Sequence, residues 1–172
     1  ADLVKSREDV ERCYTVILGR KGEEAGVTNW VNQLSSGAMG GAAVVRGFVA
    51  SQEFIGKNYS PKQVVTILYN AMLGRDPDPA GLNDWIEHME VGMTSDAIVA
   101  GFTGSQEFGN ICTRYGSLPG NFTPTEWRDR NYGVTAFVFR AYKMILIRAA
   151  EPAGQNNWCA ELLSGRMGGT DI

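Results

Sequence analysis

A single pattern of residues occurs three times along this chain, at residues 10–54, 65–108 and 138–172. Five positions of the pattern carry the same residue type in every copy. They are Tyr14, Arg20, Gly26, Trp30 and Gly37 in the first copy, Tyr69, Arg75, Gly81, Trp85 and Gly92 in the second, and Tyr142, Arg148, Gly154, Trp158 and Gly165 in the third. Chance does not produce this agreement, so we expect a fold made of stacked copies of one supersecondary unit.

The spacing of apolar residues predicts that each copy is helical. The first segment of the first copy places Val10, Cys13, Tyr14, Ile17 and Leu18 on one helix face, and the other copies repeat this spacing. A second segment carries the repeated tryptophan, and a third carries Gly-Phe followed by Ser-Gln-Glu-Phe. No stretch alternates long enough to predict a strand. The expected fold is all-α, with tandem three-helix repeats, two of them complete and a third truncated.

Capping residues predict where the helices begin and end. The candidate capping boxes are Ser6 with Asp9, Ser60 with Gln63, and Thr123 with Glu126. Gly19 and Gly74 fit the left-handed position that follows a helix. The third copy departs from the pattern, because Ile147 replaces this glycine and Gln155 replaces the apolar residue that follows the next repeated glycine.

The repeats divide the chain into three parts. We expect two helical repeats over residues 1–108, an ordered linker over 109–133 and an incomplete third repeat over 134–172. The linker is rich in Gly, Pro, Asn and Thr, which is typical of irregular structure. Its expected apolar anchors are Ile111, Tyr115, Leu118, Phe122 and Trp127.

The third copy ends before the Gly-Phe and Ser-Gln-Glu-Phe of the others. We therefore expect this chain to be part of a longer protein. The apolar face that contains Ile145 and Leu146 then needs another cover, because large apolar patches are rare on soluble monomers. We expect Phe122 and Trp127 of the linker to pack against it.

Composition excludes several classes of protein. Of 172 residues, 44% are hydrophobic and 20% are charged, which argues against disorder. The net charge of −3 gives no basic surface for nucleic acid, and no apolar run approaches the ~20 residues of a membrane span. One histidine, His88, and three cysteines offer little material for catalysis or zinc binding. We therefore expect no enzyme, no metal and no cofactor.

The repeated arginine has a structural interpretation. Arg20 and Arg75 follow the first helix, and Glu53 and Glu107 are expected at the end of the third. These residues predict the ion pairs Arg20–Glu53 and Arg75–Glu107. Arg148 has no such glutamate because the third copy ends first.

Trp127, Arg128 and Arg130 are the candidate binding residues. The repeated tryptophans lie on apolar helix faces and are expected in the core, whereas Trp127 is unique and lies beside charged residues. An exposed tryptophan is typical of a binding site. Packing of the linker is the alternative interpretation of Trp127.

The sequence leaves two questions open, one about the cysteines and one about an acidic loop. Cys13 lies on a core face and is expected to be buried, whereas Cys112 and Cys159 either remain free or form a disulfide in an oxidising compartment. The acidic loop Asp76–Asp78 either binds calcium or supplies the acid that caps the next helix. The capping interpretation is favoured, because the spacing of a calcium loop is absent.

The order Leu-Gly-Arg, Ala-Gly, Trp, Gly-Phe and Ser-x-Glu-Phe resembles the bacterial domain-of-unknown-function family 4214, over residues 8–108 and 134–172. It is distantly similar to the phycobilisome linker polypeptide, and residues 109–165 resemble the version found in surface proteins of gut Firmicutes. Family copies occur in large secreted or surface-anchored proteins, so the resemblance implies a secreted or cell-surface location. It implies nothing about an activity.

Two functions are consistent with these features. The first is a non-catalytic helical repeat module that acts as a spacer or as a binding surface for a host or wall protein, such as immunoglobulin or mucin. The alternative is a glycan-binding or glycan-active domain that uses exposed aromatic residues and carboxylates. The glutamates of the second helices, Glu87 with Glu90 and Glu23 with Glu24, make poor catalytic pairs because they are expected on solvent faces.

Overall fold

Helices and their connections make up the whole of residues 2–172, which are the residues described by this computed structural model, and none of them forms a β-strand. The all-α prediction is therefore confirmed. The first repeat contains α1 (Leu3–Cys13), η1 (Tyr14–Leu18), α2 (Glu24–Ser35), α3 (Gly41–Val49) and α4 (Gln52–Gly56). The second contains α5 (Pro61–Leu68), η2 (Tyr69–Leu73), α6 (Pro79–Glu90), α7 (Ser95–Thr103) and α8 (Gln106–Arg114). After η3 (Trp127–Asp129), the third contains α9 (Tyr132–Ala141), η4 (Tyr142–Leu146) and α10 (Pro152–Leu163).

A π-helical turn continues the first helix of every repeat. These turns are η1, η2 and η4, and each begins at the repeated tyrosine. Each ends at a residue in the left-handed region, which is Gly19 (φ 69°), Gly74 (φ 69°) or Ile147 (φ 55°). The predicted glycine positions are confirmed, and the wider turn is a feature that the apolar spacing did not reveal.

The third segment of each complete repeat is divided into two helices. The Ser51 hydroxyl accepts a hydrogen bond from the Phe54 N–H at 3.2 Å, and Ser105 accepts one from Phe108 at 3.2 Å. These serines cap new helices, α4 and α8. Glu53 therefore lies in the first turn of a helix, not at the end of one.

One of the three predicted capping boxes forms. Ser60 and Gln63 cap α5 reciprocally, as predicted. By contrast, α1 already begins at Leu3 under the Asp2 side chain, so Ser6 lies buried inside the helix. The chain around Thr123 forms no helix, and α9 is capped instead by Asn131. Both wrong predictions arose because another carboxylate or amide near the helix start was the actual cap.

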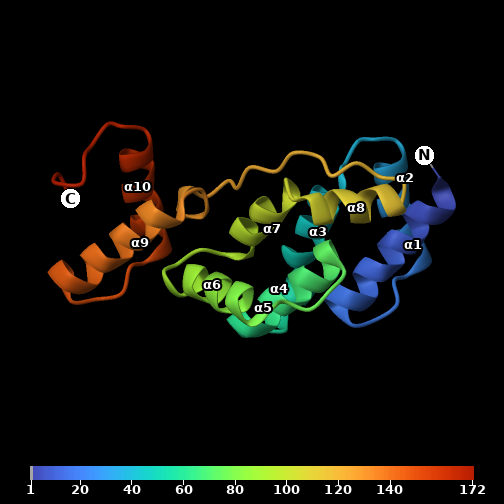
Figure 1. The fold of residues 1–172 in the computed structure, drawn as a ribbon, viewed down its shortest axis with the longest axis horizontal. Helices are drawn as coiled ribbons and strands as arrows, with labels where there is room; N and C mark the ends of the chain where they lie inside the picture. Colours follow the sequence, from blue (N-terminus) through green and yellow to red (C-terminus); the bar gives the residue numbers. More distant parts are fainter. Residues whose placement is uncertain (1) are drawn as a thin grey trace.

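Two separate cores lie along the molecule. One is shared by the first two repeats, in which α3 packs on α7 and η1 contacts η2. The other contains Val138, Tyr142 and Cys159 and belongs to the third repeat. Figure 1 shows the two bodies side by side along the long axis, with the two termini at opposite ends.

The linker is ordered and runs back along the first two repeats toward α9 (Figure 1). It begins later than the expected residue 109, because α8 continues to Arg114. The Leu118 and Pro119 carbonyls accept hydrogen bonds from the Gly41 and Ala42 N–H groups, at 2.7 and 3.0 Å. They satisfy amides that the start of α3 leaves unpaired. The Leu118 side chain itself is exposed, so it is not the anchor that was expected.

The three cysteines are free and buried, so of the two alternatives for Cys112 and Cys159 the structure has the free thiols. Cys112 belongs to the core of the first two repeats and Cys159 to the core of the third, so the two thiols lie in different cores. Cys13 is a buried core residue, as predicted. Burial raises the pKa of Cys13 to about 12 and that of Cys112 to about 11, and it also raises the pKa of Cys159.

These thiols are expected to be unreactive in the folded protein. A thiol needs its thiolate form and access to react, and burial removes both. With Ellman's reagent at pH 8 we expect fewer than ~0.1 thiols per chain in native protein, and all three after unfolding in guanidinium. Release of a single thiol on unfolding would instead show that two cysteines are bonded.

Candidate functional site

The repeated tyrosine and glycine form a close helix contact in every copy. The hydroxyl groups of Tyr14, Tyr69 and Tyr142 lie where a Cβ atom on Gly26, Gly81 and Gly154 would be. Glycine is therefore required, because any side chain would push the second helix away from the tyrosine. The repeated arginine lies over the same ring, at 5.3, 5.2 and 5.0 Å from the centroid in the three copies.

The Gly-Phe motif is explained by the repeated tryptophan. The Trp30 ring lies against Gly47 of α3 and stacks on Phe48 at 5.4 Å. The Trp85 ring lies against Gly101 of α7, 5.6 Å from Phe102. These tryptophans are half-buried against the core, which places them in packing rather than in an open aromatic platform.

Both predicted ion pairs are present. Arg20 donates to the two carboxylate oxygens of Glu53 at 2.8 Å each, and Arg75 donates to those of Glu107 at 2.7 and 3.0 Å. The hydrogen bonds from arginine lower the pKa of both glutamates. All four side chains are in contact with solvent, which screens their attraction, so the pairs fix geometry more than they stabilise.

Trp127, Arg128 and Arg130 all make contacts within the protein. The Arg130 guanidinium lies over the Trp127 ring at 4.1 Å and donates to the Pro124 carbonyl at 2.9 Å. The Arg128 backbone N–H donates to the Asn156 side chain at 3.0 Å. Trp127 packs against the core of the third repeat, as the linker-packing interpretation requires.

Buried polar groups fix the third repeat to the second. The Asp129 carboxylate accepts hydrogen bonds from the Thr94 N–H and hydroxyl, both at 2.6 Å. The Gln155 amide, fully buried, donates to the Val91 carbonyl at 2.6 Å. Gln155 replaces the apolar residue of the other copies and bridges two repeats, a role that was not predicted.

The single histidine also lies at this junction. His88 is half-buried and stacks on Tyr132 at 3.9 Å. Its Nδ1 atom lies 2.7 Å from the Asp84 carbonyl. Stacking and hydrogen bonding thus give His88 a structural role.

The acidic loop follows the capping interpretation. Asp78 accepts a hydrogen bond from the Gly81 N–H at 3.2 Å and caps α6, and Asp76 accepts one from the Asn70 side chain at 2.8 Å. Across residues 2–172, His, Cys, Asp and Glu do not gather in groups of three or more that could hold a metal ion. Nor does any helix in this range have the length and apolar character needed to cross a bilayer.

An exposed apolar face is the most unusual feature of the surface. Ile145 is 65% exposed, whereas its counterparts Ile17 and Met72 are 1% and 0% exposed. Met144, Leu146 and Ile147 are exposed beside it, so four consecutive apolar side chains face solvent. Exposed patches of this kind mark binding surfaces or aggregation sites.

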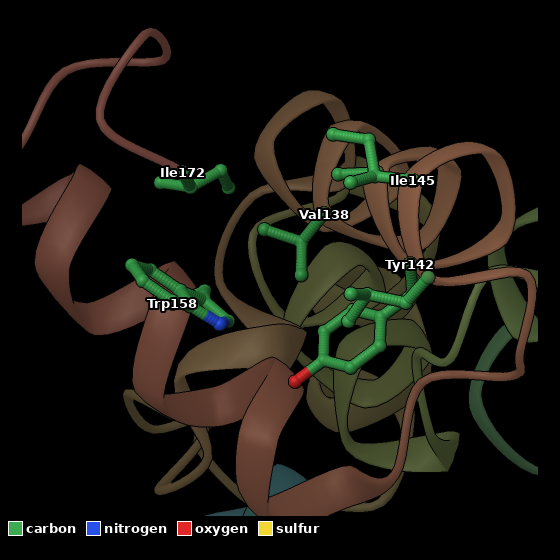
Figure 2. A pocket seen from close by; sticks show the side chains of 7 residues that line it. Val138, Tyr142, Ile145, Trp158 and Ile172 are labelled. Atoms are coloured by element: carbon green, nitrogen blue, oxygen red, sulfur yellow. The ribbon is translucent and has the colours of Figure 1, made fainter.

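A groove crosses this face between η4 and α10. It contains a cavity of about 170 Å³, lined by Val138, Ala141, Tyr142, Ile145, Leu146, Trp158 and Ile172. Figure 2 shows Trp158 and Ile172 on one side of the cavity, facing Val138, Tyr142 and Ile145 of α9 and η4. A second cavity of about 370 Å³ adjoins it through Ala141, Ile145 and Ile172. The groove is almost entirely apolar, so its chemistry suits an apolar side chain.

The prediction that Phe122 and Trp127 of the linker cover this face is partly wrong. Trp127 packs in the third repeat, but Phe122 packs against the core of the first two repeats. The linker therefore reaches only the inner side of the third repeat and leaves Ile145 and Leu146 exposed.

Ile147 holds a backbone conformation that a β-branched residue rarely adopts. Its φ of 55° lies in the left-handed region, where Gly19 and Gly74 stand in the other repeats. This conformation costs an L-residue roughly 1–2 kcal/mol. The Ile147 side chain is 87% exposed.

Replacing Ile147 by glycine is expected to stabilise the third repeat by about 1 kcal/mol. Relief of left-handed strain exceeds the entropy that glycine adds to the unfolded chain. Gly19→Ala is the reverse control and should destabilise by about 1 kcal/mol, because its Cβ would meet no atom within 4 Å and only backbone strain changes. Urea unfolding measures both, and a destabilised Ile147→Gly protein would contradict the strain argument.

Comparison with known proteins identifies one family. The model of a domain of unknown function, DUF4214, matches residues 3–58 and 48–112, which together span the first two repeats. No significant match was found among curated proteins or solved structures. The third repeat lies outside the matched residues and is recognised by its shared tyrosine, arginine, glycine and tryptophan.

Proposed function

Since this chain belongs to the DUF4214 family, whose model matches most of its length, we propose that it is a non-catalytic helical repeat module that binds another protein through the groove of its third repeat. The partner is a host or wall protein of the kind that a bacterial surface protein meets. The exposed apolar face at Met144–Ile147 is the observation that carries this proposal.

The chemistry of the groove favours a protein ligand. Its lining is apolar apart from one arginine, Arg140, at the edge of the second cavity. Burial of apolar area is the main favourable term in protein association. An aliphatic or aromatic anchor from a partner would gain the most by entering this groove.

The junction between the second and third repeats supports the spacer role. The Thr94–Asp129 and Gln155–Val91 hydrogen bonds and the His88–Tyr132 stack hold the groove in a fixed direction relative to the other repeats. A fixed direction suits a module that presents a binding surface at one end.

A glycan-binding or glycan-active domain is less well supported. Sugar sites combine an aromatic platform with polar groups that bind hydroxyls, and catalysis needs two facing carboxylates. Trp127 is covered by Arg130, and no carboxylate lines either cavity of the groove. We propose a secreted or cell-surface location from the resemblance of the repeat to those of surface-anchored proteins.

Capture from host secretions and wall extracts tests the proposed function. Immobilised protein is compared with an Ile145→Asp variant, which places a charge in the groove at a position already exposed. Val4→Asp is the matched control, because Val4 is equally exposed but belongs to α1, which lies at the opposite end of the molecule (Figure 1). We expect the Ile145→Asp variant to lose at least ten-fold in captured partner while the control is unchanged. Equal capture by all three proteins, or binding only to glycans, would contradict the proposal.

A further inference from the structure

We propose that the groove of the third repeat binds a helix pair of the type that α3 and α4 form in the first repeat. The partner segment would carry Gly-Phe on one helix and Ser-x-Glu-Phe at the start of the next. This inference rests on the proposed function, because it names the class of protein segment that the groove accepts.

The aromatic contacts of the complete repeats indicate what fits in the groove. Phe48 of α3 meets the Tyr14 ring edge-on at 4.8 Å and stacks on Trp30 at 5.4 Å. Phe102 of α7 also lies between Tyr69 and Trp85, and meets both rings edge-on, at 4.9 and 5.6 Å. One phenyl ring therefore fills the space between the repeated tyrosine and tryptophan.

The third repeat keeps the tyrosine and tryptophan but has no phenyl ring between them. Tyr142 and Trp158 instead line the cavity of about 170 Å³, and Ile172 lies at its edge (Figure 2). A phenylalanine of the proposed partner would take this position. Ile145 would then be covered, as Ile17 and Met72 are in the complete repeats.

Arg148 makes one hydrogen bond to a glutamate, whereas its counterpart Arg20 makes three. Arg20 binds Glu23 through one terminal nitrogen, and binds Glu53 of α4 through Nε and the other. Arg148 binds Glu151, the counterpart of Glu23, through one terminal nitrogen. Its Nε and remaining terminal nitrogen bind no other group within residues 2–172.

The remaining donors of Arg148 match the glutamate of the proposed partner in charge, and the groove matches its phenylalanine in shape. Arg148 lies over the Tyr142 ring at 5.0 Å, as Arg20 lies over Tyr14 at 5.3 Å, so its guanidinium is already oriented. The glutamate of Ser-x-Glu-Phe is the group that this orientation serves in the other repeats. The proposed partner therefore meets an apolar groove and a positioned arginine together.

The chain offers a direct test through its own sequence. Residues 164–169 read Ser-Gly-Arg-Met-Gly-Gly and residues 36–41 read Ser-Gly-Ala-Met-Gly-Gly, and the latter lead into α3. A chimera can therefore join residues 1–169 to a second copy of residues 42–59. The matched control carries Phe48→Asp in the appended copy only, so it has the same length and the same first repeat.

Docking of the appended helices is expected to raise the melting temperature of the third repeat by at least about 5 °C. Binding of the apolar dye ANS should fall several-fold relative to the unmodified chain, because the groove is covered. The Phe48→Asp chimera should show neither change. Arg148→Gln should lower the melting temperature of the chimera by more than it lowers that of the unmodified chain, because only the chimera supplies the glutamate.

Each other outcome overturns the inference. An unchanged melting temperature and unchanged dye binding would show that the groove does not accept this helix pair. Equal behaviour of the two chimeras would show that the phenylalanine is not the anchor. A chain that sedimentation shows to be dimeric through this face has a second copy as its occupant. Capture of a partner by the unmodified chain together with a failed chimera would retain the proposed function and reject only this partner class.

Discussion

Truncation of Ile17 to alanine is expected to destabilise the protein by about 3 kcal/mol, whereas the same change at Ile145 should alter stability by less than about 0.5 kcal/mol. The two residues hold the same position of the repeat, but Ile17 is buried in the shared core and Ile145 faces solvent. A buried isoleucine loses its transfer free energy and leaves a cavity when it is truncated. Truncation of the exposed isoleucine loses little transfer free energy and leaves no cavity.

Urea unfolding followed by circular dichroism measures both changes. Met72→Ala is a further control, because Met72 is the buried counterpart in the second repeat and should also lose about 3 kcal/mol. A loss of several kcal/mol for Ile145→Ala would mean that the face is covered in solution. That result would contradict the exposed groove on which both proposals depend.

Arg12→Met is expected to destabilise the protein by about 3 kcal/mol. Arg12 pairs with Asp9 at 3.1 Å and donates to the Asn70 and Ala71 carbonyls of η2, at 3.2 and 2.7 Å. Methionine keeps the apolar length of the side chain but leaves a buried carboxylate and two carbonyls without this donor. Removing one partner of a buried ion pair is costly for this reason.

The pH dependence of this loss identifies its cause. Burial raises the pKa of Asp9, and Arg12 opposes that effect. Without Arg12 the pKa in the folded state rises further above that of the unfolded chain. A raised carboxyl pKa stabilises the folded state at low pH, and this stabilisation is lost as the pH rises through the folded-state value. The deficit of Arg12→Met should therefore be largest near neutral pH and should shrink on acidification.

Two further variants separate charge from packing. Adding Asp9→Leu to Arg12→Met removes the buried charge and should recover part of the lost stability. Arg7→Met is the surface control, because Arg7 pairs with Glu24 and Glu11 in solvent and should change little. A deficit that is the same at every pH would show that Asp9 is not the destabilising group.

The repeat made most of the fold predictable from the sequence. Three copies of one helical pattern identified the tyrosine and apolar faces, and the Arg20–Glu53 and Arg75–Glu107 pairs, before any contact was known. The π-helical turns were not predictable, because the apolar spacing is the same for an α-helix with one wider turn. The break before α4 could have been found from Ser51, which is a good N-cap residue in the middle of the segment.

The candidate site was harder to predict, because it depends on contacts between distant segments. Trp127 was singled out because it is unique, but Arg130 covers it and the third core receives it. The sequence indicated that the apolar face of the third repeat needs a cover, but the prediction that Phe122 covers it was wrong, because Phe122 packs on the core of the first two repeats. Gln155 gave a signal, since a polar residue at an apolar position of a repeat indicates a buried hydrogen-bond partner such as the Val91 carbonyl.

The presence of two cores has a consequence for cooperativity. The first two repeats share one core, whereas the third joins them through a few hydrogen bonds and one aromatic stack. All-or-none unfolding requires that no part of a chain can lose its structure alone, and a small second core does not meet this condition. The third repeat would unfold as a separate cooperative unit while the larger core stays folded. The unfolding of this chain is therefore described by two transitions and not by one.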